Sequence, residues 1–132
     1  MNALILQEKL DMKIVYLCCK EEVTRESGDD LVRDTKFYSA DLQNIDLLKE
    51  NHEVIPIDVN SNYLETIKEI NPDVIFNGAD GFSNIYDEVK LIKSLENLEI
   101  PFTGCSSYTT LLASNKGEAK KLLNKNKIST AN

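Results

Sequence analysis

The sequence predicts an α/β fold: a Rossmann-like three-layer domain with a four-stranded parallel sheet flanked by helices. Three observations support this prediction. Short apolar runs rich in β-formers alternate with segments whose apolar residues recur at steps of three and four. Such alternation is typical of parallel βαβ crossovers, which are right-handed almost without exception. The length of 132 residues suits one domain with its own core, burying roughly two thirds of the unfolded surface.

The amino-terminal half predicts two strands and two helices. After an N-terminal extension over residues 1–11, the domain of residues 12–132 begins with an apolar run at 13–18, the expected central strand. Residues 20–37 are charged and lack an apolar period, so they predict a long loop that is either functional or mobile. The remaining elements are a helix capped by Ser39 with Leu42, Ile45 and Leu48 on its buried face, a strand at 53–57, and a helix marked by Leu64, Ile67 and Ile70.

The carboxyl-terminal half predicts two further strands. The first, at 73–76, lies between Pro72 and the glycines of the following loop, and the second is at 100–103. The helix between them carries its apolar face on Ile85, Val89, Ile92, Leu95 and Leu98. A last helix begins near Asn115, with Glu118 three residues later as in a capping box. We expect the second and third strands to lie on opposite sides of the first.

Composition narrows the class of protein. A net charge of −7 argues against a general nucleic-acid binder, and no run approaches the ~20 apolar residues of a membrane span. Cys18, Cys19 and Cys105 are odd in number and show no C-x-x-C spacing, so we interpret them as reduced thiols in a cytoplasmic protein. His52 is the single histidine, which excludes a multi-histidine metal site, and we expect no resident metal.

Two segments remain as candidate sites. Neither a G-x-G-x-x-G nor a Walker pattern is present, which disfavours nicotinamide, flavin and P-loop readings. In the loop after residue 76, glycine lets backbone N–H groups face a ligand and Asp80 can accept a bond from an amino group. The alternative is a plain turn in which Asn77 and Asp80 bond their own backbone. At the last helix, Lys116 stands at the first helical position and suits a phosphate oxygen, the alternative being an exposed lysine.

Three segments carry a family resemblance. Residues 74–81, 100–104 and the Asn115-Lys116 pair resemble, in order and spacing, the amino-terminal (pre-ATP-grasp) domain of the D-alanine:D-alanine ligase family, within the ATP-grasp ligases. The resemblance implies that Lys116 contacts ATP phosphates. It also implies that the loop after residue 76 borders the substrate site, which makes its residues candidates for substrate binding: Asn77, Gly78, Asp80 and Gly81.

One departure from the family concerns the segment after the first strand. The family has glycines, a serine and a glutamate there, and the glutamate holds the substrate amino group. This chain has Glu21, Glu22 and Glu26 nearby without that pattern. Glu21 and Glu22 are therefore candidates for substrate binding, and the class implied is an ATP-dependent carboxylate–amine ligase in general, reacting through an acylphosphate. No catalytic residue is identified.

The resemblance also implies partners and cofactors. The full-length protein would use ATP and Mg²⁺ with an amino acid or related carboxylate, and it would carry ATP-grasp domains in cis and possibly form a homodimer. Residues 128–132 match the junction at which the family continues, so we expect either a truncated chain or a stand-alone domain, and no ATP turnover by these residues alone. The alternative function is a non-catalytic small-molecule-binding or interaction domain, and the length of the natural gene separates the two.

Overall fold

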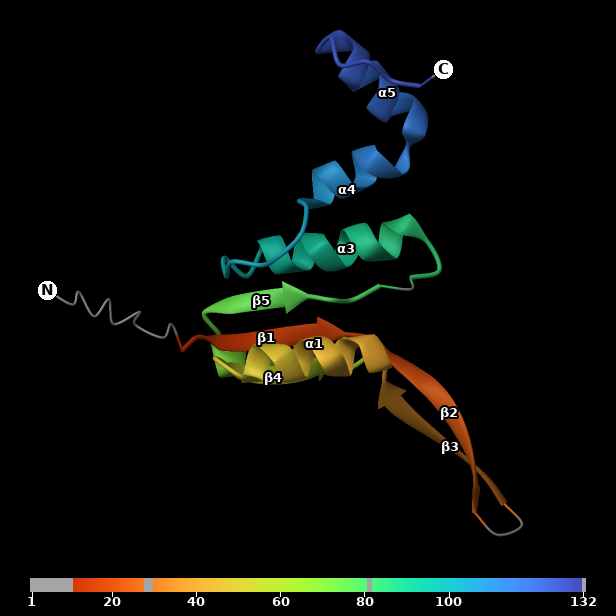
Figure 1. Ribbon diagram of the computed structural model, residues 1–132, viewed down its shortest axis with the longest axis vertical. Helices are drawn as coiled ribbons and strands as arrows, with labels where there is room; N and C mark the ends of the chain where they lie inside the picture. Colours follow the sequence, from red (N-terminus) through yellow and green to blue (C-terminus); the bar gives the residue numbers. More distant parts are fainter. Residues whose placement is uncertain (1–10, 28–29, 81, 132) are drawn as a thin grey trace, which may run out of the picture.

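Figure 1 shows the computed structural model, which describes residues 11–27, 30–80 and 82–131. After an initial run of three strands, helices and strands alternate as far as α3, and two further helices follow. Their bounds are β1 Lys13–Cys18, β2 Lys20–Ser27, β3 Asp30–Phe37, α1 Ser39–Lys49, β4 Glu53–Asp58, α2 Tyr63–Ile70, β5 Val74–Asn77, α3 Ile85–Glu96, α4 Ser107–Ser114 and α5 Lys116–Lys125.

The central sheet is parallel and has the order β4-β1-β5, so the predicted placement of the second and third parallel strands around the first is confirmed. The prediction of four parallel strands is wrong among the described residues. Residues 100–103 make only an isolated bridge between Phe102 and Ile75. The segment is short because Glu99 and Gly104, at φ 58° and 108°, turn the backbone at both ends, and a proline within it lacks the N–H that a ladder needs.

Two apolar layers enclose the sheet, as the predicted three-layer arrangement requires. Side chains alternate along β1, so Val15 and Leu17 face α2 and α3 while Ile14, Tyr16 and Cys18 face α1. The first layer also contains buried residues of the two helices: Ile67, Leu91 and Leu95. The second contains Ile45 of α1. With both faces covered, the sheet presents its carboxyl edge as the place for a site.

Helix α1 differs from its predicted form at two positions. Ser39 is the first helical residue and not the cap; Tyr38 occupies the cap position and makes no side-chain cap hydrogen bond. Ile45 is buried and Leu48 half-buried, whereas Leu42 is 46% exposed. The buried stripe of α1 is therefore narrower than the sequence predicts, and polar side chains in its first turn are free to face the sheet edge.

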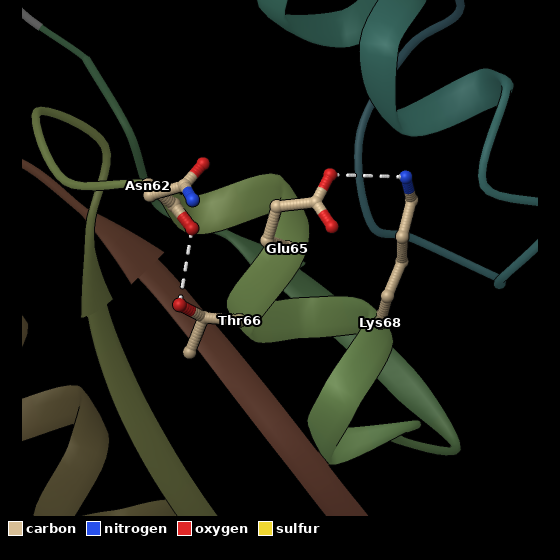
Figure 2. Close-up of polar contacts among 4 residues, drawn as sticks. All are labelled: Asn62, Glu65, Thr66 and Lys68. Atoms are coloured by element: carbon tan, nitrogen blue, oxygen red, sulfur yellow. Dashed lines mark hydrogen bonds and ion pairs between the residues drawn. The ribbon is translucent and has the colours of Figure 1, made fainter.

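Helix α2 is stabilised on its outer side by local polar contacts (Figure 2). The Thr66 hydroxyl donates to the Asn62 carbonyl at 3.0 Å, and Lys68 Nζ lies 3.3 Å from Glu65 Oε1. Asn71, at φ 47°, ends the helix in the left-handed conformation just before Pro72. Both contacts of Figure 2 are local to α2 and its first turn, so we assign them a role in helix formation.

Residues 20–37 form an antiparallel hairpin and not the predicted loop. Strands β2 and β3 pair from Lys20 with Phe37 to Ser27 with Asp30. The hairpin projects from the end of β1 away from the central sheet (Figure 1). Its base is anchored because Phe37 packs against the second core layer and Lys20 Nζ lies 4.7 Å from the centre of the Phe37 ring.

Helices α3, α4 and α5 stack outward from β5 (Figure 1). The sequence analysis predicts α3 and the start of α5 but no helix at α4. Ser106 instead caps α4 by accepting from the Thr109 N–H at 3.2 Å. Glu96, the last residue of α3, accepts from the Ser107 N–H at 2.8 Å and from its hydroxyl at 2.7 Å. These bonds lower the pKa of the Glu96 carboxyl.

Candidate functional site at the carboxyl edge of the sheet

The loop that follows β5 is fixed by hydrogen bonds at its start. The Asn77 N–H donates to the Thr103 hydroxyl at 3.0 Å, and the Gly78 N–H donates to the Leu17 carbonyl of β1 at 2.8 Å. The Asn77 side-chain oxygen accepts from the Ala79 N–H at 3.4 Å, which is the local turn bond considered for this residue. Gly81 lies outside the described residues. The loop therefore leaves β5 along a defined path.

Gly78 is required by a close approach to Tyr16. A Cβ at position 78 would lie 2.9 Å from the Tyr16 hydroxyl and 3.0 Å from two ring carbons. The tyrosine ring is 1% exposed and stacks on Phe76, with centroids 4.8 Å apart and planes 9° apart. The ring therefore cannot move aside for a side chain at position 78. Packing against Tyr16 alone explains why this position is glycine, whether or not the loop also binds a ligand.

The Tyr16 hydroxyl connects the sheet to α1. It donates to Asp41 Oδ1 at 2.9 Å and accepts from the Asn44 amide at 3.2 Å. Burial raises the pKa of Tyr16, and the neighbouring Asp41 adds to this increase against the opposing Asn44 bond. The buried hydroxyl thus stays protonated and holds the Asp41 carboxylate at the edge of the sheet.

A cavity of about 350 Å³ lies at this edge, lined by Tyr38, Ala40, Asp41 and Asp80. Within the described residues the Asp80 carboxylate makes no hydrogen bond or ion pair, whereas its backbone carbonyl accepts from the Cys19 thiol at 3.1 Å. Two carboxylates and a tyrosine around one space favour a cationic group such as an ammonium. Sequence analysis found Asp80 and missed Asp41, whose only sequence signal is an acid in a first helical turn.

The hairpin glutamates do not line this cavity. Glu21 Oε1 lies 3.2 Å from Lys36 Nζ across the hairpin, and Glu22 is exposed opposite Thr35. The side chain of Glu26 falls outside the description. The hairpin therefore carries the two candidates Glu21 and Glu22 away from the loop that holds Asp80.

Lys116 lies in a different part of the molecule. Asn115 caps α5 by accepting from the Glu118 N–H at 3.2 Å, as the predicted capping pattern requires. Lys116 is exposed and has no ion-pair partner among the described residues. Beside it, an apolar cavity of about 430 Å³ lies between the start of α3 and the end of α4, lined by Ile85, Tyr86, Tyr108, Leu111, Leu112, Ser114, Asn115 and Glu118. Helix α5 lies on the outer side of α4, farther from the central sheet than α3 (Figure 1).

The remaining titratable candidates have structural surroundings. All three cysteines are free; burial and nearby carboxylates raise the pKa of Cys18 to about 12, and Cys105 is exposed. His52 Nδ1 accepts from the Met12 N–H at 3.3 Å. In the part of the chain that the structure describes, no three His, Cys, Asp or Glu residues gather to hold a metal, and no helix is long and apolar enough to cross a membrane.

Comparison with known proteins gives one curated relative. A D-alanine–D-alanine ligase from Carboxydothermus hydrogenoformans is 32% identical over 126 residues, which cover 92% of this chain and 36% of the ligase. No family model matches the chain, and no solved structure matches it. The resemblance seen in the sequence is confirmed by this match, which extends over nearly the whole chain. The chain therefore belongs to the D-alanine–D-alanine ligase family and spans about a third of the length of the relative that it matches.

Proposed function

We propose that the chain is the amino-terminal substrate domain of an ATP-dependent carboxylate–amine ligase of the ATP-grasp type, and that the cavity at the carboxyl edge holds the ammonium group of its amino-acid substrate. The observation that carries this proposal is the pairing of Asp41 and Asp80 around one cavity at the end of β5. The relative's name, a ligase of D-alanine, supplies the substrate class.

Electrostatics support an ammonium ligand over a carboxylate in this cavity. The Asp80 carboxylate has no partner among the described residues, and Asp41 keeps one oxygen beyond the bond that it accepts from Tyr16. A charge-assisted bond from an ammonium to either would be shorter and about twice as strong as a neutral one. The substrate carboxylate would then point out of the cavity, toward the activating group.

This chain contains one residue that suits a phosphate group of ATP. Lys116 offers an ammonium that has no ion-pair partner in the described part of the chain, beside a helix start whose N–H groups lack intrahelical acceptors and suit a phosphate oxygen. Bound ATP with Mg²⁺ would supply the phosphoryl group that activates the carboxylate as an acylphosphate. No three His, Cys, Asp or Glu side chains gather within the described residues to hold Mg²⁺.

Ligand titration by NMR tests the substrate proposal on this chain. D-alanine should shift the amide signals of residues 77–80 and of Asp41, whereas propionate, which lacks the ammonium, should not. Loss of one charge-assisted bond in Asp80→Asn should weaken D-alanine binding roughly tenfold to a hundredfold. Asp46→Asn, a matched change on the exposed side of α1, should leave binding unchanged.

Two results would contradict this assignment. Equal shifts from propionate and D-alanine would show that no ammonium site exists at the edge. Unchanged affinity in Asp80→Asn, with shifts confined to other residues, would favour the alternative of a binding domain whose ligand lies elsewhere on the fold.

A further inference from the structure

One buried side chain touches both halves of the candidate cavity. Tyr16 lies in the middle of β1, is 1% exposed, and faces α1 in the second core layer. Its hydroxyl binds Asp41 of α1, and the hydroxyl end of the ring is also the part nearest to Gly78, two residues before Asp80. The two carboxylates that line the cavity thus come from segments that meet at this tyrosine.

The ring of Tyr16 has a fixed place in the sheet. It stacks on Phe76 of β5, with ring centroids 4.8 Å apart, and β1 pairs with a parallel strand on each side, β4 and β5. Core strands of this kind open only in near-global unfolding. The hydroxyl is therefore a fixed point from which the first turn of α1 can be held.

The hydrogen bonds at this hydroxyl can run in one direction only. Asp41 Oδ1 and Asn44 Nδ2, three positions apart on one face of α1, lie 2.9 Å and 3.2 Å from the Tyr16 hydroxyl oxygen. The Asn44 amide nitrogen only donates and an ionised carboxylate only accepts, so the single hydroxyl proton has Asp41 as its acceptor. Since burial raises the pKa of Tyr16, that proton is retained at neutral pH.

We infer that Tyr16 is a positioning residue of the ammonium site, because it holds the Asp41 carboxylate in one rotamer beside the Asp80 loop. This inference rests on the proposed function. One carboxylate oxygen of Asp41 is bound to the tyrosine, and the other stays available to a ligand. The ligand then meets a carboxylate that is already oriented, and binding does not have to order that side chain. Tyr16 is not among the residues that line the cavity, so it acts through Asp41.

Side-chain couplings measured by NMR test the positioning without any ligand. Three-bond couplings from the Asp41 carboxyl carbon to the backbone report the χ1 angle of that residue. The unmodified chain should show the couplings of one staggered rotamer, and Tyr16→Phe, which keeps the ring and removes the hydroxyl, should show values averaged over more than one. Tyr63→Phe is the matched control, because Tyr63 packs in the other core layer, across the sheet, and should leave the Asp41 couplings unchanged. Averaged couplings in the unmodified chain, or no change in Tyr16→Phe, would overturn the inference.

A double-mutant cycle tests whether the tyrosine affects binding through Asp41. Tyr16→Phe should raise the dissociation constant for D-alanine about threefold to tenfold, the scale of one hydrogen bond. In an Asp80→Asn background a similar factor should remain, whereas in an Asp41→Ala background it should fall below about twofold. A general effect of Tyr16→Phe on the fold would instead appear equally in both backgrounds, and that result would overturn the inference.

D-alanine binding by the unmodified chain distinguishes failure of the site from failure of this inference. If D-alanine shifts no signal of residues 77–80 or of Asp41, the ammonium site does not exist, and the role of Tyr16 in binding is overturned together with the proposed function. If D-alanine binds there and the effect of Tyr16→Phe persists in Asp41→Ala, the site stands and only its positioning by Tyr16 is overturned.

Discussion

Replacement of Gly78 by alanine gives a direct test of the packing that shapes the candidate site. The new Cβ would lie 2.9 Å from the Tyr16 hydroxyl, closer than real Cβ atoms approach, and at a tight 3.0 Å from two ring carbons. The ring is buried against Phe76 and its hydroxyl is tied to Asp41 and Asn44, so it cannot move without breaking these contacts. Overpacking of this kind costs about 1–3 kcal/mol. We expect Gly78→Ala to lower the free energy of unfolding by that amount.

Urea denaturation measures this loss as a lower midpoint at unchanged slope. Gly117→Ala is the matched control, because its Cβ would meet only the Asn115 side-chain oxygen at 3.4 Å and alanine favours a helix by about 0.5–1 kcal/mol. In a Tyr16→Phe background Gly78→Ala should cost less than in the original protein, since the nearest contact is with the hydroxyl. A Gly78→Ala protein as stable as the original would show that the loop and ring are not held as described.

The remaining predictions concern the nucleotide, the pH dependence and the thiols. In ATP-dependent ligation, Lys116→Ala should reduce kcat/KM for ATP roughly tenfold to a hundredfold while Lys125→Ala changes little, and equal small effects would remove the support for a phosphate contact. Because hydrogen bonds from the start of α4 lower the pKa of Glu96, the stability that this carboxylate adds is present above its ordinary pKa and is lost as pH falls through the lowered one. Glu96→Gln should therefore flatten the acid limb of the curve of unfolding free energy against pH. With a thiol reagent near neutral pH, Cys105 should react at once and Cys18 only on unfolding, since the pKa of Cys18 is raised to about 12.

The central sheet could be predicted from the sequence because its signals are local and strong. The run at β1 is apolar on both faces, and the helix periods on either side of it require parallel crossovers. The sequence contains no equally local signal against the predicted fourth strand at residues 100–103. Its apolar residues fit a strand, but the left-handed backbone at Glu99 and Gly104 limits it to one bridge, and positive φ at a glutamate has no clear sequence signal.

The sequence analysis predicts neither the hairpin nor α4, for two different reasons. β2 and β3 carry charges on both faces, so the alternation of apolar and polar residues that indicates a half-buried strand is absent. α4 has apolar residues but no buried one, and its start depends on Glu96, eleven residues earlier. The hairpin depends on pairing between two neighbouring strands, and the start of α4 depends on a residue eleven positions away, so apolar periodicity within one window detects neither.

The candidate site was predictable only in its β5 half. Asn77, Gly78 and Asp80 follow a recognisable strand, whereas Asp41 reaches the same cavity because Tyr16 binds it from the middle of β1. That contact spans 25 residues, and nothing in the first turn of α1 distinguishes Asp41 from a solvated acid.

The chain between Asp80 and Lys116 contains three helix starts, each capped by a polar side chain. α3 starts where Asn84 accepts from the Asp87 N–H at 3.0 Å, α4 where Ser106 accepts from the Thr109 N–H at 3.2 Å, and α5 where Asn115 accepts from the Glu118 N–H at 3.2 Å. Neither α4 nor α5 contains a buried residue. The position of Lys116 relative to the loop therefore depends on these caps and on partly exposed apolar contacts between the helices. Each cap contributes about 1 kcal/mol. Under the proposed function, an ammonium site on the well-packed sheet and a phosphate contact on this less buried helix would let nucleotide binding order the second part after the first is filled.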